Sequence, residues 1–194
     1  KILLLGLGGG GSNILTLLAG LGPKSIKIVD YDIVELGNLG RQFLYRENDI
    51  GKKKTEIAKS AVEKMNSLIK IEAFDKKIVV VEDVLELIND VDIVICAIDE
   101  PPFIIHRIVN EASVKAGIPC VFGASQVSRG RVYSVVPRVT GCFDCLNLHF
   151  SKNDSKFIEQ FVGFRNINFD PPSIAYGPGI FQLVAGIVDE VVRI

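Results

Sequence analysis

Short apolar runs alternate with segments of helical periodicity through the first 123 residues, and this alternation limits the possible folds more than any other feature of the chain. The apolar runs lie at residues 1–5, 25–30, 69–74, 91–98 and 118–123, and the helical segments at 12–21, 52–67, 81–88 and 103–116. Strands that are apolar at successive positions are typical of a sheet covered by helices on both faces. The pattern predicts an α/β fold with a Rossmann-like, doubly wound and mainly parallel sheet.

The pattern changes after Gly123. Residues 130–141 alternate between apolar and polar and are bounded by turn residues, which predicts antiparallel strands and a sheet that becomes mixed in the C-terminal half. Residues 146–175 are too long for an ordinary connection and are expected to form a functional loop or to be partly helical. A final helix is predicted from about Gly179, with apolar residues around most of its surface.

The length of 194 residues favours one domain, residues 1–194. Because Lys1 already belongs to a strand and Ile194 lies inside a helix, we expect this domain to be a piece of a longer chain. The 22 basic and 23 acidic side chains give no electrostatic reason for a nucleic-acid partner, and no apolar run is long enough for a membrane partner. The sequence predicts a cytoplasmic protein, and its four cysteines are too few for a disulfide scaffold.

A glycine-rich loop joins the first apolar run to the first helical segment. Its glycines are Gly6, Gly8, Gly9, Gly10 and Gly11. Such a loop lets the backbone approach a phosphate, and the helix start near Ser12 attracts an anion. Asp30 ends the next strand, where an acid accepts hydrogen bonds from ribose hydroxyls. The glycine-rich loop and Asp30 together predict a nucleotide-binding site. An NAD-dependent oxidoreductase would have the same two features.

The segment after Asp30 carries amide and basic side chains that a dehydrogenase does not need: Asn38, Arg41, Gln42 and Lys54. Cationic donors stabilise the charge that develops when a carboxylate attacks the α-phosphorus of a nucleoside triphosphate. Alternatively, Lys52, Lys53 and Lys54 are an exposed helix start and Arg41 forms a surface ion pair.

Asp99 follows a buried strand, at the sheet edge where open α/β folds bind ligands. One carboxylate beside phosphate oxygens and waters suits Mg²⁺. The alternative is that Asp99 caps the helix that starts after Pro101 and Pro102.

Three motifs, GxGGxGS at residue 6, DxDxVExxNLxRQ at residue 30 and DxGxxK at residue 49, resemble the ThiF/MoeB family of adenylating enzymes, whose fold ubiquitin-activating enzymes share. The resemblance covers nearly the whole chain. It implies ATP and Mg²⁺ as cofactors, catalysis by Arg41, Lys54 and Asp99, and a homodimer. The implied nucleotide-binding residues are Gly6, Gly8, Gly9, Gly11, Asp30, Asp32, Asn38, Arg41, Gln42, Lys54 and Asp99, with Asp30 on the ribose and Asp99 on Mg²⁺. Gly37 and Gly40 depart from the polar residues usual at these positions.

Cys142 and Cys145 form a CxxC that supplies two thiolates to a tetrahedral Zn²⁺. The resemblance implies a second CxxC beyond Ile194, so these two cysteines are expected to be a structural zinc half-site. A redox CxxC would stand at a helix start near the beginning of a thioredoxin-like unit, which this pair is not expected to do. Cys96 and Cys120 lie in apolar runs and are expected to be buried, and His106 and His149 are expected to have packing or surface roles.

Residues 146–194 contain no cysteine that could accept an activated carrier as a thioester. Together with DEPPF at residue 99 and GCFDC at residue 141, this resembles the peptide-modifying branch typified by the microcin C7 enzyme MccB. The expected function is therefore ATP- and Mg²⁺-dependent adenylation of the C-terminal carboxylate of a ribosomal peptide, giving an acyl-adenylate and pyrophosphate. The alternatives are activation of a ubiquitin-like sulfur-carrier protein and a noncatalytic leader-peptide docking module.

Overall fold

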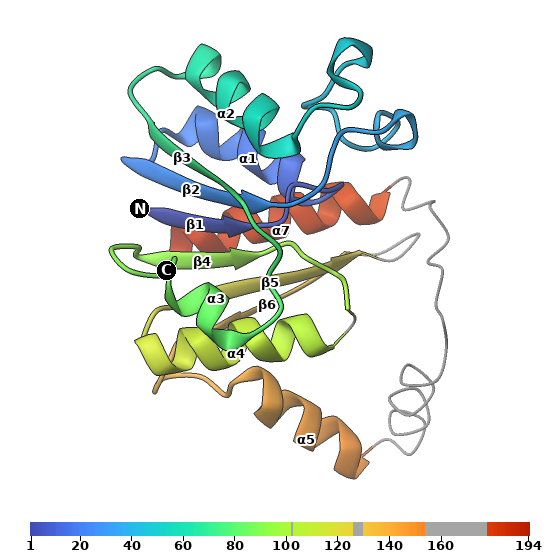
Figure 1. Ribbon diagram of the computed structural model, residues 1–194. Helices are drawn as coiled ribbons and strands as arrows, with labels where there is room; N and C mark the ends of the chain where they lie inside the picture. The colour runs from blue at the N-terminus through green and yellow to red at the C-terminus, as the bar shows by residue number, and fades with distance from the viewer. Residues whose placement is uncertain (102, 126–129, 154–177) are drawn as a thin grey trace.

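A six-stranded sheet runs through the centre of the protein in the computed structural model, which describes residues 1–101, 103–125, 130–153 and 178–194. The strands are β1 (Ile2–Leu5), β2 (Ser25–Asp30), β3 (Lys70–Asp75), β4 (Ile93–Cys96), β5 (Cys120–Ser125) and β6 (Gly130–Val135). They are ordered β3-β2-β1-β4-β5-β6 (Figure 1). Strands β1 to β5 are parallel, whereas β6 is antiparallel to β5. The predicted Rossmann-like fold with a mixed C-terminal half is confirmed.

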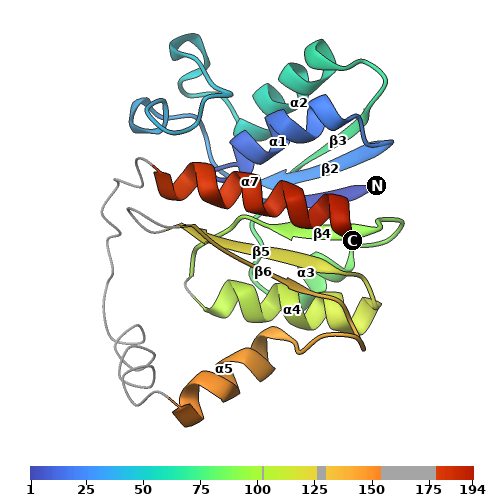
Figure 2. The same cartoon turned by 180° about the vertical axis from the view of Figure 1, so that it is seen from behind.

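Helices cover both faces of this sheet. They are α1 (Gly11–Leu21), α2 (Lys54–Met65), α3 (Val81–Leu85), α4 (Ile104–Ala116), α5 (Phe143–Asn153) and α7 (Pro178–Arg193). Helices α1, α2 and α7 lie on one face, α3 and α4 lie on the other, and α5 lies outside α4 (Figures 1 and 2). No helix in the described ranges is both long and apolar enough to cross a membrane.

The two apolar cores explain why the strands are apolar at successive positions. Along β1, Leu4 packs into the core under α1 and α7, while Leu3 and Leu5 pack into the core under α3 and α4. All three leucines are fully buried. Burying a leucine side chain contributes about 1.5 to 3 kcal/mol, so the apolar residues at successive positions of β1 each stabilise the fold.

The predicted C-terminal helix is α7, which buries one face and leaves the other in solvent. Ile180, Leu183 and Ile187 are buried, whereas Phe181 is 60% exposed. The buried face lies against β5 and β6 at positions without side chains: a Cβ added at Gly123 would overlap Leu183. Glycines in the sheet therefore let this helix approach closely.

The segment after the CxxC is helical where the structure describes it. Helix α5 covers Phe143–Asn153, and the remainder of the predicted loop or partly helical segment lies outside the described residues. The helix begins between the two cysteines of the CxxC, a helix start that the sequence did not indicate. Its start is stabilised from α4, where the side-chain oxygen of Asn110 accepts a hydrogen bond from the Phe143 N–H at 3.0 Å.

Candidate active site

The candidate site lies at the C-terminal edge of the sheet, where the loops after β1, β2 and β4 meet. The Gly6 N–H donates to the Val29 carbonyl at 2.8 Å, and the Ala97 N–H donates to the Leu5 carbonyl at 2.8 Å. These bonds join the glycine loop to the ends of both neighbouring strands. Open α/β sheets bind ligands at this edge, so the three loops that carry the predicted residues have a common position.

The glycines of the loop have different physical roles. Gly6 has a φ of +92°, and a Cβ there would lie 2.8 Å from the Ala97 carbonyl oxygen. A Cβ at Gly11 would overlap the Gly6 carbonyl, so both positions require glycine for the fold. Apart from its chain neighbours, a Cβ at Gly8 would meet no atom of the described residues within 4 Å. Gly8 therefore faces open space, where a ligand could approach the backbone.

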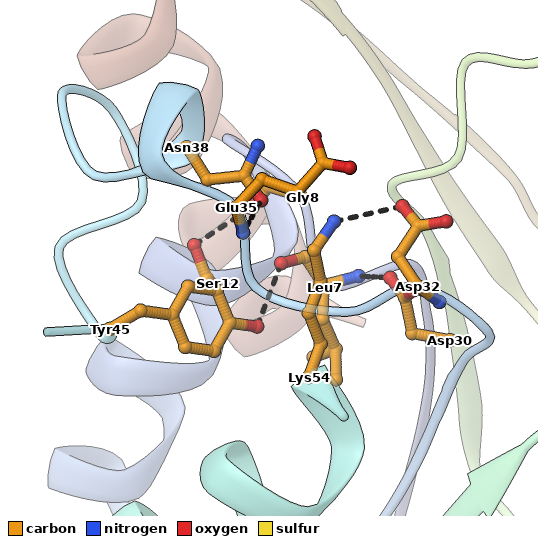
Figure 3. Close-up of polar contacts among 9 residues, drawn as sticks. All are labelled: Leu7, Gly8, Ser12, Asp30, Asp32, Glu35, Asn38, Tyr45 and Lys54. Carbon is orange, nitrogen blue, oxygen red and sulfur yellow. Dashed lines mark hydrogen bonds and ion pairs between the residues drawn. The ribbon is translucent and has the colours of Figure 1, made fainter. Parts of the chain in front are cut away.

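Two buried side chains hold the loop at Leu7. Asp30, which is 9% exposed, accepts the Leu7 N–H through Oδ2 at 2.6 Å, and the Tyr45 hydroxyl donates to the Leu7 carbonyl at 3.0 Å (Figure 3). The other Asp30 oxygen accepts the Asp32 N–H at 2.8 Å. Burial, together with the charges of Asp30 and Asp32, raises the pKa of Tyr45, so its hydroxyl remains a donor. Asp30 thus has a structural task at the position where a ribose ligand was predicted.

Lys54 and Asp32 form an ion pair of 2.8 Å beside the glycine loop (Figure 3). The Lys54 side chain is 5% exposed, whereas that of Asp32 is 46% exposed. Backbone bonding fixes the same contact, because the Lys54 N–H donates to the Asp32 carbonyl at 3.0 Å. Lys54 is therefore not part of an exposed helix start, although Lys52 and Lys53 form ion pairs at the surface.

Arg41 lies across the glycine loop. Its Cδ is 3.5 Å from the place that a Gly9 Cβ would occupy, and its Nη1 donates to the Gly37 carbonyl at 2.8 Å. Asn38 and Gln42 lie deeper, at 9% and 2% exposure. The Asn38 oxygen accepts the Glu35 N–H at 3.1 Å (Figure 3), and the buried Oε1 of Gln42 has no hydrogen-bond partner among the described residues. The structure thus brings Arg41 to the loop and buries both amide side chains.

Asp99 is exposed beyond the end of β4, two residues after Ala97. Helix α4 begins at Ile104 with Phe103 as its N-cap residue, so Asp99 is not the cap of that helix. Nearby, His106 is partly buried and its Nδ1 lies 3.1 Å from the Tyr133 hydroxyl. Burial lowers the pKa of His106, and the Ile98 carbonyl and the Asp99 carboxylate oppose that shift. His106 thus has the packing role predicted for it.

The CxxC lies apart from these loops, at the start of α5. The Sγ atoms of Cys142 and Cys145 are 3.6 Å apart. Burial raises the pKa of the Cys142 thiol, but hydrogen bonds from the first turn of α5 and from Asn110 outweigh burial and lower it. In the described ranges, no group of three or more histidine, cysteine or acidic side chains is placed to hold a metal. Cys96 and Cys120 are buried, as predicted.

Two residues of the site were missing from the sequence predictions. Tyr45 holds the glycine loop through Leu7, and Asn13 connects that loop to the segment of Arg41. Asn13 directly follows the glycine motif, and a carboxamide just before the apolar residues of α1 is a signal that could have been used. Tyr45 has no comparable signal, because a tyrosine that follows an apolar residue fits a hydrophobic core as well as a binding site.

A model of the ThiF family matches residues 1–194. The sulfur carrier protein ThiS adenylyltransferase of Bacillus subtilis is 37% identical over 148 residues, which are 75% of this chain and 43% of that protein. The NEDD8-activating enzyme E1 catalytic subunit of Caenorhabditis elegans is 31% identical over 75% of this chain and 36% of its own length.

The crystal structure of E. coli MccB with AMPCPP and MccA has a TM-score of 0.82 and 29% identity, over 100% of this chain and 55% of that one. The chain therefore spans about half the length of the proteins that it resembles.

Proposed function

Because the chain belongs to the ThiF family, we propose that residues 1–194 are the adenylation domain of an ATP-dependent adenylyltransferase. The observation that carries this proposal is the meeting of three loops at one edge of the sheet. There, Gly8 faces open space while Lys54, Arg41 and Asp99 come from separate segments toward the same edge. Relatives of the chain are named adenylyltransferases, and E. coli MccB has been crystallised with ATP, which supports the same reaction here.

The reaction requires positioning and charge stabilisation more than proton transfer. An oxygen of the substrate carboxylate forms a bond to the α-phosphorus, and the bond from that phosphorus to the bridging oxygen breaks. Pyrophosphate leaves with the electron pair, and the acyl-adenylate remains. A carboxylate is ionised at neutral pH, so no general base is needed. Arg41, with its forked donors, and Lys54, a point charge, stabilise negative charge on the phosphate oxygens.

The two acidic residues of the loop after β2 have different tasks in this proposal. Both oxygens of Asp30 already accept backbone N–H groups, whereas the Asp32 carboxylate is half exposed. Asp32 therefore offers the accessible acceptor for ribose hydroxyls, and Asp30 holds the glycine loop.

Asp99 fits a Mg²⁺ site by the chemistry of its donor group. Its exposed carboxylate is a hard oxygen ligand beside the proposed phosphate position, and Mg²⁺ favours one or two carboxylates with phosphate oxygens and waters. When bound, Mg²⁺ would neutralise charge on the phosphates. Asp99 itself would hold the ion beyond the end of β4.

The proposed substrate is the C-terminal carboxylate of a ribosomal peptide. The likeness to E. coli MccB with MccA extends over 100% of this chain, and residues 146–194 lack a cysteine for thioester transfer. The second candidate is a ubiquitin-like sulfur-carrier protein, which the 37% identity to a ThiS adenylyltransferase favours. In either case we expect the protein to act as a homodimer, which light scattering after size-exclusion chromatography would test.

Cys142 and Cys145 are proposed to supply two ligands to a structural Zn²⁺. Two thiolates on one tetrahedral zinc lie roughly 3.8 Å apart, because each Zn–S bond is about 2.3 Å long. The observed separation of 3.6 Å is close to this value. The other two ligands would have to come from outside the described residues.

Pyrophosphate exchange into ATP tests the proposal on the full-length protein with Mg²⁺. The panel contains short peptides, carrier proteins that end in Gly-Gly, and a control without substrate. Arg41→Ala and Asp99→Ala should each lower exchange by about a hundredfold, the scale for one lost transition-state contact. The control is Arg107→Ala, since Arg107 forms an exposed ion pair with Asp144 away from the site. A panel without exchange, together with no ATP binding, would instead favour the peptide-docking module.

A further inference from the structure

The carboxamide of Asn13 joins two parts of the candidate site that are far apart in sequence. Asn13 lies in the first turn of α1. Its Nδ2 donates to the Gly9 carbonyl at 2.7 Å and to the Arg41 carbonyl at 3.0 Å, and its Oδ1 accepts the Phe43 N–H at 3.4 Å. One side chain therefore holds the glycine loop and the segment 41–43 together across 28 to 30 residues of sequence.

These contacts need both functions of a carboxamide. The two carbonyl oxygens require donors, and the Phe43 N–H requires an acceptor on the same side chain. Asparagine supplies two donor hydrogens and an acceptor oxygen, whereas an aspartate of the same shape has no donor. The bond to the Gly9 carbonyl spans four residues and could serve the helix alone, but the bonds to Arg41 and Phe43 serve no helix.

The backbone position of Arg41 matters because its side chain lies over the glycine loop. Its Cγ and Cδ are 3.6 and 3.5 Å from the place of a Gly9 Cβ. An arginine that stabilises phosphate charge must be held in place before the reaction, and a shift of about 1 Å lowers the rate of a positioned reaction. Asn13 bonds to the backbone directly after that side chain, at the carbonyl of Arg41 and the N–H of Phe43.

We infer that Asn13 is a positioning residue for Arg41: it fixes the segment 41–43 on the glycine loop so that the guanidinium group is directed toward the phosphates. Asn13 acts through Arg41 and is not a ligand of ATP. This inference rests on the proposed function, since it assigns Asn13 a task within the same ATP site.

Hydrogen exchange in the nucleotide-free, full-length protein tests the structural half of the inference. In Asn13→Ala and Asn13→Asp, the backbone amides of residues 41–45 should exchange about threefold to tenfold faster, the factor expected for a lost hydrogen bond of ordinary strength. The matched control is Thr16→Ala. Thr16 is partly buried one turn later on α1, and its hydroxyl donates only within that helix, to the Ser12 carbonyl at 3.0 Å. Unchanged exchange at residues 41–45 in both Asn13 variants would overturn the inference.

A double-mutant cycle on ATP affinity tests the functional half. Calorimetry with Mg²⁺ and ATP should show a Kd about threefold to tenfold weaker for Asn13→Ala than for the wild type. In an Arg41→Ala background the same change should cost less than twofold, because the residue that Asn13 positions is already absent. Equal losses in both backgrounds would show that Asn13 does not act through Arg41. A wild-type protein that binds no ATP would overturn the proposed function, while hydrogen exchange would still decide whether Asn13 holds the segment.

Discussion

Replacing Asp30 with asparagine tests whether this residue holds the glycine loop. Asp30 accepts the Leu7 N–H at 2.6 Å and the Asp32 N–H at 2.8 Å, one through each carboxylate oxygen. Asparagine keeps the shape but has one oxygen, so one N–H would face an NH₂ group. A hydrogen bond to a charged group contributes about 1.5 to 3 kcal/mol, and an unpaired buried donor adds a further penalty. We expect Asp30→Asn to lower the free energy of unfolding by about 3 kcal/mol.

The assay is thermal unfolding followed by circular dichroism. For a protein of this size, about 3 kcal/mol corresponds to a fall in Tm of about 6 to 12 °C. Asp32→Asn is the matched control, because its side chain is half exposed and an amide oxygen could still accept from Lys54. Asp32→Asn should lower Tm by less than half as much as Asp30→Asn. Relative to its fall in Tm, Asp32→Asn should weaken ATP binding more than Asp30→Asn does. Equal falls in Tm for the two variants, or a fall below about 2 °C for Asp30→Asn, would refute the structural role.

Three further predictions follow from the same geometry. Gly8→Ala should leave Tm unchanged and weaken ATP binding about tenfold by calorimetry, whereas Gly11→Ala, whose Cβ would overlap a backbone carbonyl, should lower Tm by several degrees. Hydrogen bonds from two backbone N–H groups before α3 and from a lysine lower the pKa of Asp83 to about 2. Its contribution to stability is therefore complete above about pH 4 and is lost as the pH falls through 2. The urea midpoint of unfolding should therefore fall less steeply with decreasing pH in Asp83→Asn than in the wild type. The double variant Cys142→Ser/Cys145→Ser should contain about one zinc fewer per chain than the full-length wild type, as measured by elemental analysis. An unchanged zinc content would contradict the proposed site.

Much of the fold could be predicted because its physical cause is local. Strands such as β1 and β4 are apolar at successive positions because both faces are buried, and this pattern is visible without a structure. An antiparallel strand was also predicted, from the alternation of residues 130–141, and β6 forms its first half. The buried face of α7 was not predicted, because Phe181 and Leu183 are equally apolar in the sequence. Only packing on the sheet buries Leu183 and leaves Phe181 exposed.

The candidate site was predicted as a set of residues but not as an arrangement. The sequence placed Arg41, Lys54 and Asp99 in one site, because motif spacing and strand ends are properties of the chain. It assigned the ribose to Asp30 and gave Asp32 no separate task, although the structure separates the two acids. Their difference is that one is buried against the Leu7 N–H and the other is exposed beside Lys54.

The sequence by itself therefore determined the order of strands and helices, the glycine loop and the identity of the charged groups near it. Only the tertiary structure decided which of these groups are held and which are accessible. Asn13 and Arg41 are 28 residues apart, and nothing in the local sequence indicates that the carboxamide of one bonds to the backbone of the other. Such contacts depend on how separate segments pack, because hydrogen-bond partners are set by distance in space and not by distance along the chain.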